Sequence, residues 1–221
     1  MIQQLRVIAI VFAFILCVGA LTQAANAGES DPFQRILAVG ETAPDFSLPD
    51  QNGKVHHLSE YKGKIVVLAF YPADFTKGCT LEAHVNTEYF KQYQAAGLTL
   101  IGVSVQTPES HKAFCEKYGI PYTILADSKG VMAARYGVLG APFAGKFPDK
   151  AWYSNPKESA ALYYKLNPGQ VPGLAKRITF IIGKNGKIAY VDSNVDSHLQ
   201  TCAPDWINWA KGHAALLNAK E

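Results

Sequence analysis

Residues 65–84 read IVVLAFYPADFTKGCTLEAH, and this stretch decides the fold. Its first seven residues form an apolar run, which predicts a strand buried on both faces. The residues from Thr80 onwards predict a helix, so Cys79 lies where a buried strand passes into a helix. At that position the sulfur faces the free N–H groups and the positive dipole end of the first helical turn. Both favour the thiolate, which is the reactive form of cysteine.

Four residues around this junction form a spaced pattern, Pro72-x3-Thr76-x2-Cys79-x2-Glu82. The pattern resembles the active-site motif of the peroxiredoxins of the AhpC/TSA superfamily, thiol peroxidases built on a thioredoxin-like fold. Within that family the chain most resembles the bacterioferritin-comigratory (Q-type) branch. The resemblance covers most of the chain and includes residues 43–46, 103–104, 110–112 and 177–182.

Peroxide cleavage places negative charge on the departing oxygen, so a cation has to lie beside the reactive sulfur. We expect Arg177, at the start of a late strand, to supply this charge; an ordinary surface arginine is the alternative. Glu82, one helical turn after Cys79, can pair with the Arg177 guanidinium, unless it is a solvated helix carboxylate. The resemblance implies that Thr76 hydrogen-bonds the peroxide and that Pro72 shields the thiolate.

The composition is that of a single globular domain. A chain of 221 residues can bury one sizeable core. The formal net charge is only +3 and the Lys and Arg residues are scattered, which argues against the basic stripe of a nucleic-acid-binding protein.

Residues 1–27 have the pattern of a secretory signal peptide. Arg6 ends a short positive segment, an apolar run covers 7–21, and Ala25-Asn26-Ala27 supplies the small residues of a cleavage site. We therefore expect an exported protein, periplasmic or secreted, whose mature domain covers 28–221 and is free of the membrane. A retained anchor is the alternative, but the apolar run is shorter than the ~20 residues that a spanning helix needs.

Three cysteines remain after such cleavage, namely Cys79, Cys115 and Cys202. An odd number suits a catalytic thiol better than a disulfide-stapled scaffold. Once oxidised to a sulfenic acid, Cys79 must be reduced or captured by a second, resolving thiol. By resemblance, many Q-type relatives carry that thiol five residues later, where this chain has His84. We expect Cys115, in the next helix, to resolve; Cys202 before the last helix, or no resolving cysteine, stays open.

Along the mature chain, strands alternate with helices. We predict strands at 65–71, 98–105 and 122–125, helices at 80–96, 108–118 and about 204–217, and hairpins at 46–57 and 178–191. The order predicts an α/β fold, a thioredoxin-like three-layer sandwich with a central mixed sheet and an N-terminal β-hairpin.

The segment from about 138 to 176 does not fit the compact alternation. It is rich in proline and glycine, and it carries the aromatic residues Phe143, Phe147, Trp152, Tyr153, Tyr163 and Tyr164. Members of the branch that the chain resembles generally have a shorter connection at this point. Such a long insertion either binds a partner or packs its aromatic residues on the domain's own surface.

The sequence predicts no metal or cofactor site. His56 and His57 are neighbours on one strand and point to opposite faces, and the chain has no glycine-rich phosphate loop and no Cys-x-x-Cys pair. We therefore predict a peroxidase that reduces hydrogen peroxide and organic hydroperoxides without a bound cofactor, with an external thiol reductant such as a thioredoxin-like protein. The alternative is a non-catalytic redox sensor or partner-binding module on the same scaffold. The oligomeric state is not predicted.

Overall fold

The computed structural model describes residues 35–140, 162, 165–168 and 173–219, which belong to one compact unit, Phe33–Glu221. The predicted signal peptide and the aromatic residues named in the 138–176 segment lie outside the described residues. Within the described ranges, no helix combines the length and the hydropathy needed to span a membrane.

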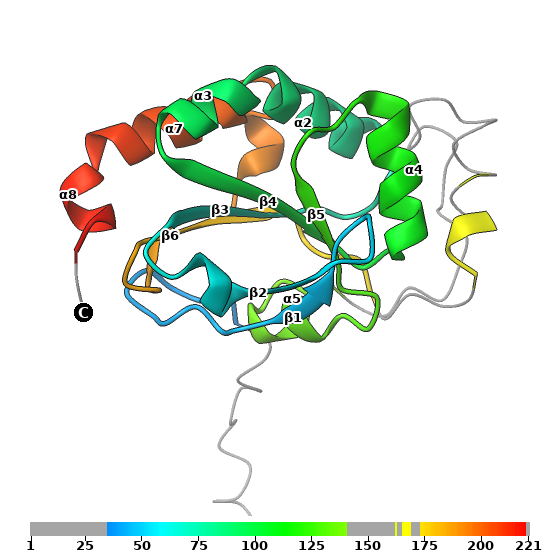
Figure 1. The fold of residues 1–221 in the computed structure, drawn as a ribbon, viewed down its shortest axis with the longest axis horizontal. Helices are drawn as coiled ribbons and strands as arrows, with labels where there is room; N and C mark the ends of the chain where they lie inside the picture. Colours follow the sequence, from blue (N-terminus) through cyan, green and yellow to red (C-terminus); the bar gives the residue numbers. More distant parts are fainter. Residues whose placement is uncertain (1–34, 141–161, 163–164, 169–172, 220–221) are drawn as a thin grey trace, which may run out of the picture. The chain divides into compact units, whose positions relative to one another are not determined.

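A five-stranded mixed sheet forms the centre of the unit, in the order β5-β4-β3-β6-β7 (Figure 1). The strands are β3 (Ile65–Phe70), β4 (Leu98–Ser104), β5 (Thr123–Ala126), β6 (Ile178–Ile182) and β7 (Ile188–Asp192). β3 pairs in parallel with β4, and β4 with β5, whereas β6 and β7 run antiparallel to their neighbours. All six residues of β3 are buried, which is why the apolar run takes a central place.

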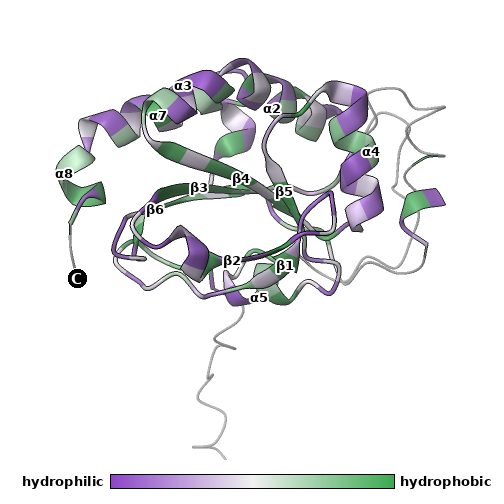
Figure 2. Cartoon of the chain, in the orientation of Figure 1, coloured by the Kyte–Doolittle hydropathy of each residue, from purple (hydrophilic) through white to green (hydrophobic). Residues whose placement is uncertain are grey.

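Side chains along β3 alternate between two separate core clusters, one on each face of the sheet. Val67 and Ala69 belong to the first cluster, and Val66, Leu68 and Phe70 to the second. The first face is covered by α2 (Lys77–Glu88), α3 (Phe90–Ala95), α4 (Pro108–Tyr118), α7 (Cys202–Gly212) and α8 (Ala214–Leu217) (Figure 1). The second face is covered by β1 (Ser47–Pro49), β2 (Val55–His57), η2 (Leu58–Tyr61) and α5 (Val131–Arg135). The central strands are largely hydrophobic, whereas the helices carry both hydrophobic and hydrophilic residues, as expected of helices that pack one face on a sheet (Figure 2).

The predicted fold class is confirmed, including the N-terminal hairpin, in which β1 and β2 pair antiparallel. The single helix predicted over 80–96 is wrong in two respects. Helix α2 begins earlier, at Lys77, because Thr76 has the extended backbone of an N-cap residue. The helix also ends near Tyr89, and the resulting bend lets the Tyr93 hydroxyl on α3 donate to Asn86 Oδ1 at 2.9 Å.

Candidate active site

The loop between β3 and α2 places Cys79 in the first turn of α2. Cys79 is the third residue of the helix and is only 2% exposed. Phe75, just before the N-cap, has a φ of 63°, a left-handed conformation that costs a non-glycine residue about 1–2 kcal/mol. Its buried ring packs edge-on against Phe114 of α4, with 5.3 Å between ring centroids. Packing against α4 therefore holds the strained loop in place.

Thr76 and Pro72 both lie in the loop that precedes the first turn of α2, as the sequence pattern predicts. The Thr76 hydroxyl donates to the Ala73 carbonyl oxygen at 2.9 Å, so the hydroxyl oxygen is left to act as an acceptor. Thr76 is buried and Pro72 is half-buried. Their roles toward a peroxide stay predictions.

Arg177 lies directly against the reactive sulfur, with its Nη2 atom 3.2 Å from Cys79 Sγ. Strand register brings it there, because Phe70 at the end of β3 pairs with Ile178 at the start of β6. Gly78 permits the approach, since a Cβ atom at that position would lie 3.1 Å from Arg177 Nη2. The Arg177 side chain is 6% exposed. A buried cation thus contacts the thiol that the sequence marks as the nucleophile.

Two carboxylates contact the Arg177 guanidinium. Glu82 Oε2 accepts from Nη1, as expected from its place one turn after Cys79, and Asp196 Oδ1 accepts from Nε at 2.6 Å. Burial by itself would lower the pKa of Arg177, but Cys79, Glu82 and Asp196 together hold it above its ordinary value. The guanidinium is therefore charged at every physiological pH.

Glu82 is buried, so it is not the solvated helix carboxylate that the sequence left as the alternative. Desolvation raises its pKa above the ordinary value, although the neighbouring Arg177 opposes that shift. Oε1, the carboxylate oxygen that does not contact Arg177, has no hydrogen-bond partner among the described residues. Glu82 thus depends on Arg177 for its ionised state.

The other two cysteines are buried free thiols. Burial raises the pKa of Cys115, on α4, to about 12, and it also raises the pKa of Cys202 well above its ordinary value. Cys202 was predicted to precede the last helix, but it is the first residue of α7, where its Sγ donates to the Leu199 carbonyl at 3.3 Å. Neither thiol is activated as a nucleophile while it stays buried.

Sequence reasoning missed a buried polar cluster that fastens the active-site loop to α4. Asp74 accepts from the Tyr71 hydroxyl at 2.7 Å, from Ser110 Oγ at 2.7 Å and from His111 Nδ1 at 2.8 Å. Asp74, Ser110 and His111 are fully buried. Ser110 and His111 belonged to the segment of resemblance, but only contacts between distant segments reveal what they bind.

Asp196 was also missed, because nothing in its local sequence points to Arg177. It follows β7 in the short helix η4 (Val195–Ser197) and reaches the arginine only through the fold.

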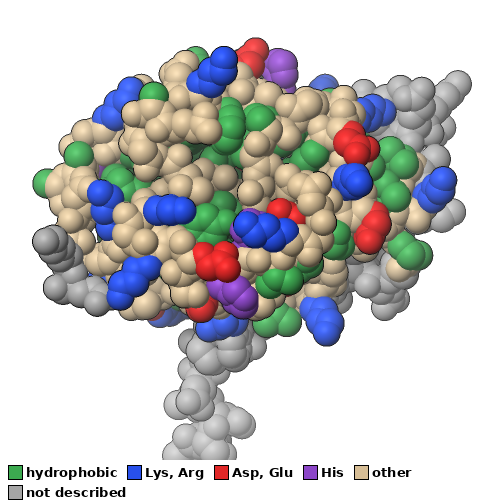
Figure 3. All heavy atoms as spheres, in the orientation of Figure 1, with side chains coloured by type: hydrophobic (Ala, Val, Ile, Leu, Met, Phe, Trp, Pro, Cys, Tyr) green, Lys and Arg blue, Asp and Glu red, His purple; other side chains and the backbone are tan. Residues whose placement is uncertain are grey.

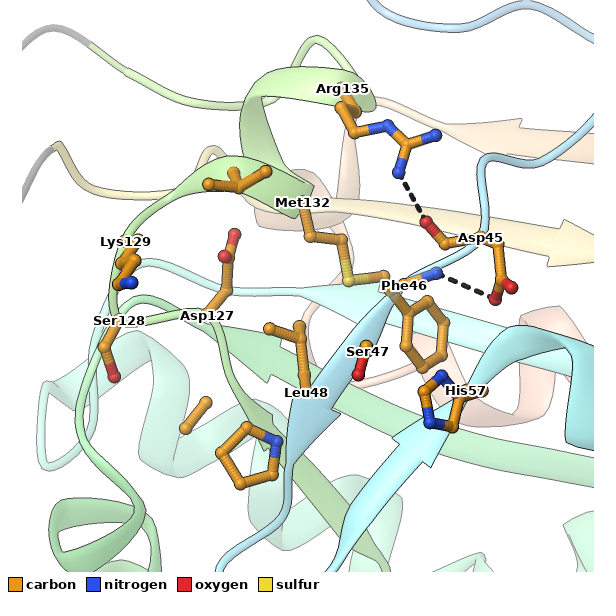
Figure 4. Close-up of a pocket in the computed structure, with 13 residues that line it drawn as sticks. Asp45, Phe46, Ser47, Leu48, His57, Asp127, Ser128, Lys129, Met132 and Arg135 are labelled. Atoms are coloured by element: carbon orange, nitrogen blue, oxygen red, sulfur yellow. Dashed lines mark hydrogen bonds between the residues drawn. The ribbon is translucent and has the colours of Figure 1, made fainter.

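A hollow of about 680 Å³ lies on the other face of the sheet, and none of these side chains line it (Figure 4). Two of its charged residues make hydrogen bonds to the protein backbone: Asp127 accepts from the Ala133 N–H at 2.7 Å, and Arg135 donates to the Asp45 carbonyl at 2.6 Å. Burial raises the pKa of Asp127 to about 6, against the opposing effect of the α5 N–H groups. In the part of the chain that the structure describes, no three His, Cys, Asp or Glu residues are placed to hold a metal.

Charged side chains are scattered over the face in view in Figure 3, where Lys and Arg do not gather into a basic patch. This agrees with the low net charge.

Comparison with known proteins adds family and fold relationships to this geometry. Residues 39–191 match the model of the AhpC/TSA family. Peroxiredoxin Q, chloroplastic, from Triticum aestivum is 40% identical over 134 residues, which are 61% of this chain and 61% of that protein. The protein of the same description from Gentiana triflora is 36% identical over 158 residues, 72% of this chain and 60% of that protein. The matches span about three fifths of the length of these two relatives.

Solved structures show the same fold. The crystal structure of peroxidoxin BcpB from Mycobacterium tuberculosis has a TM-score of 0.62 at 27% identity, and covers 80% of this chain and 98% of its own. A mutant of Xylella fastidiosa PrxQ has a TM-score of 0.64 at 23% identity, with coverage of 81% and 99%.

Proposed function

Because the chain belongs to the AhpC/TSA family, we propose that it is a thiol-dependent peroxidase of the peroxiredoxin Q kind, which reduces hydrogen peroxide and organic hydroperoxides at Cys79. The observation that carries the proposal is the 3.2 Å contact between Arg177 Nη2 and Cys79 Sγ at the start of α2. The fold could satisfy a buried arginine with carboxylates alone. A thiolate and a departing oxyanion, in contrast, both need a positive charge beside them.

In the first step the Cys79 thiolate attacks the terminal oxygen of the peroxide. An S–O bond forms while the O–O bond breaks, which leaves a sulfenic acid on Cys79 and releases an alkoxide, or hydroxide, that takes a proton from water. Arg177 stabilises the negative charge on the departing oxygen, and Glu82 holds the guanidinium in position. Thr76 accepts a hydrogen bond from the peroxide, and Pro72 shields the sulfur.

In the second step the Cys115 thiol attacks the Cys79 sulfenic acid, which forms a disulfide and releases water. Cys115 lies in the same core cluster as Cys79, as a resolving thiol should. Its burial and raised pKa require α4 to unwind locally before the thiol can react. An external dithiol, such as a thioredoxin-like protein, then reduces the disulfide. Cys202, in the same cluster, is the second candidate.

We also propose that residues 1–27 direct export to an oxidising compartment and that the mature domain begins after them. The curated relatives are described as chloroplastic, which supports N-terminal targeting in general. The short apolar run and the small residues before position 28 favour a secretory signal over other targeting segments.

Peroxide turnover tests the proposal directly. The chain lacking residues 1–27 is mixed with hydrogen peroxide or an alkyl hydroperoxide and a dithiol, and peroxide loss is followed beside Cys79→Ser. We expect repeated turnover that Cys79→Ser abolishes, because an alcohol is a much poorer nucleophile at neutral pH. Consumption of a single equivalent without cycling would favour the redox sensor instead.

A further inference from the structure

The loop between β7 and α7, residues 193–201, forms a wall of the candidate site that the proposed mechanism does not use. It carries Asp196, whose Oδ1 accepts from Arg177 Nε at 2.6 Å. It also carries Leu199, whose Cδ1 lies 3.7 Å from the place that a Cβ on Gly78 would occupy. The loop thus lies against both the cation and the first turn of α2.

Asp196 and Glu82 hold the guanidinium from two different elements. Glu82 on α2 accepts from Nη1, and Asp196 accepts from Nε, which leaves Nη2 directed at Cys79 Sγ. Arginine is a planar fork, so a single partner leaves it free to swing about one bond, whereas two partners determine its orientation. The two carboxylates together therefore set where Nη2 lies.

The Asp196 side chain is 74% exposed, and an exposed ion pair is worth little unless its partner is already held in position. The backbone around it is fixed by the fully buried side chain of Val195 and by the Ser197 hydroxyl, which donates to the Asn194 carbonyl at 2.7 Å. The side chain of His198 also holds this loop in position.

His198 joins the two elements at the ends of the loop. Its Nε2 lies 2.9 Å from Asp192 Oδ2 on β7, and its Nδ1 lies 2.9 Å from Asp205 Oδ2 in the first turn of α7. His198 therefore bridges β7 and α7, with one ring nitrogen directed at each carboxylate.

Both acceptors are built into the same region. Asp192 Oδ2 also accepts from Trp206 Nε1 at 2.8 Å, and Asp205 Oδ2 accepts from the Thr201 hydroxyl at 2.8 Å. Tyr190 on β7, Glu82 on α2 and Cys202 on α7 also interact electrostatically with Asp192. Asp196 on the loop adds a further negative charge. The loop is thus closed at its base by one histidine ring between two carboxylates.

We propose that Asp196 is a positioning residue for Arg177, and that His198 is the clasp that holds Asp196 in place by bridging Asp192 and Asp205. The inference rests on the proposed function, because it concerns the arginine that acts on peroxide. It adds Asp196 and His198, which lie outside the sequence pattern around Cys79, to the residues that the reaction needs. The orientation of the catalytic cation depends on a loop that follows the last strand.

The test exploits two effects of opposite sign. Removing the negative charge of Asp196 would, by charge alone, strengthen the attraction between Arg177 and the Cys79 thiolate and so speed alkylation of Cys79. Losing the orientation of Arg177 would slow it. We expect Asp196→Ala to slow both iodoacetamide alkylation of Cys79 and its reaction with peroxide, by about 10-fold as for other supporting hydrogen bonds. Asp196→Asn should retain most of the rate, because its amide oxygen still accepts from Nε.

His198→Ala should slow the same two reactions, and it should have no further effect in the Asp196→Ala background, because it acts through that residue. His84→Ala is the matched control, since it removes an exposed histidine paired with Glu88 at 3.3 Å and away from Arg177. Circular dichroism and thermal melts verify that each variant folds. Faster alkylation in Asp196→Ala, or additive losses in the double variant, would overturn the proposal. Alkylation does not need peroxide, so a protein without peroxidase activity would refute the proposed function and leave this test intact.

Discussion

Replacing Arg177 tests how much of the chemistry depends on its charge. Two unit charges 3.2 Å apart attract by about 5 kcal/mol at an effective dielectric constant of ~20. Water that enters in place of the side chain recovers part of this. We therefore expect Arg177→Ala to lower the second-order rate constant with peroxide by about 100- to 1000-fold, as for loss of one donor in an oxyanion hole.

The same substitution leaves the Glu82 carboxylate buried without its cation. This should lower the free energy of unfolding by about 3–5 kcal/mol. A double variant, Arg177→Ala with Glu82→Gln, removes the stranded carboxylate and should recover most of that stability while keeping the slow rate. Glu82→Gln alone should reduce the rate less, because it orients the cation without supplying the charge.

Acidity offers a second check on this reasoning. The pKa of Glu82 is already raised by burial, and loss of Arg177 should raise it further. A carboxyl whose pKa is higher in the folded state binds more protons there, so the free energy of unfolding of Arg177→Ala should fall as pH rises through that pKa. Stopped-flow peroxide kinetics and urea unfolding at several pH values measure both effects. A double variant that reacts with peroxide as fast as the wild type would show that another group stabilises the departing oxygen.

Three further predictions concern other groups. Cys115→Ser should allow one rapid peroxide reaction but stop recycling by a dithiol, with Cys79 accumulating as sulfinic acid, while Cys202→Ser should cycle normally; mass spectrometry of the oxidised thiols decides, and a Cys79–Cys202 disulfide would contradict the assignment. Asp127 has a pKa raised from 3.8 to about 6, so its contribution to stability should be lost as pH rises through that range, and Asp127→Asn should remove this dependence from urea unfolding curves; an unchanged pH profile would refute it. Asp74→Ala should remove the carboxylate that accepts from the buried Ser110 and His111 side chains and cost about 3–5 kcal/mol of unfolding free energy, whereas a loss no larger than that of a surface substitution would show that the cluster does not hold the loop.

The chain's sequence alone determined the framework. The apolar run at 65–71 predicted a buried strand, which the structure confirms as β3, and it leads through the loop into the helix that carries Cys79. The position of the thiol at a helix N-terminus therefore followed from neighbours in the chain. The alternation of strands and helices, with the hairpin at 46–57, determined the layers. These signals are local, because backbone conformation and burial pattern depend on residues a few positions apart.

The sequence predicted that Arg177 and Glu82 meet at Cys79, but only the tertiary structure decided how they are placed and which other polar groups join them. The pairing of Phe70 with Ile178 places Arg177 beside Cys79, and the turn after β7 brings Asp196 to the same guanidinium. Asp74 and His111, 37 residues apart, meet between a loop and a helix. Such contacts leave no periodic trace in the sequence, since a hydrogen bond depends on the separation and orientation of two atoms in space and not on the distance between their residues along the chain.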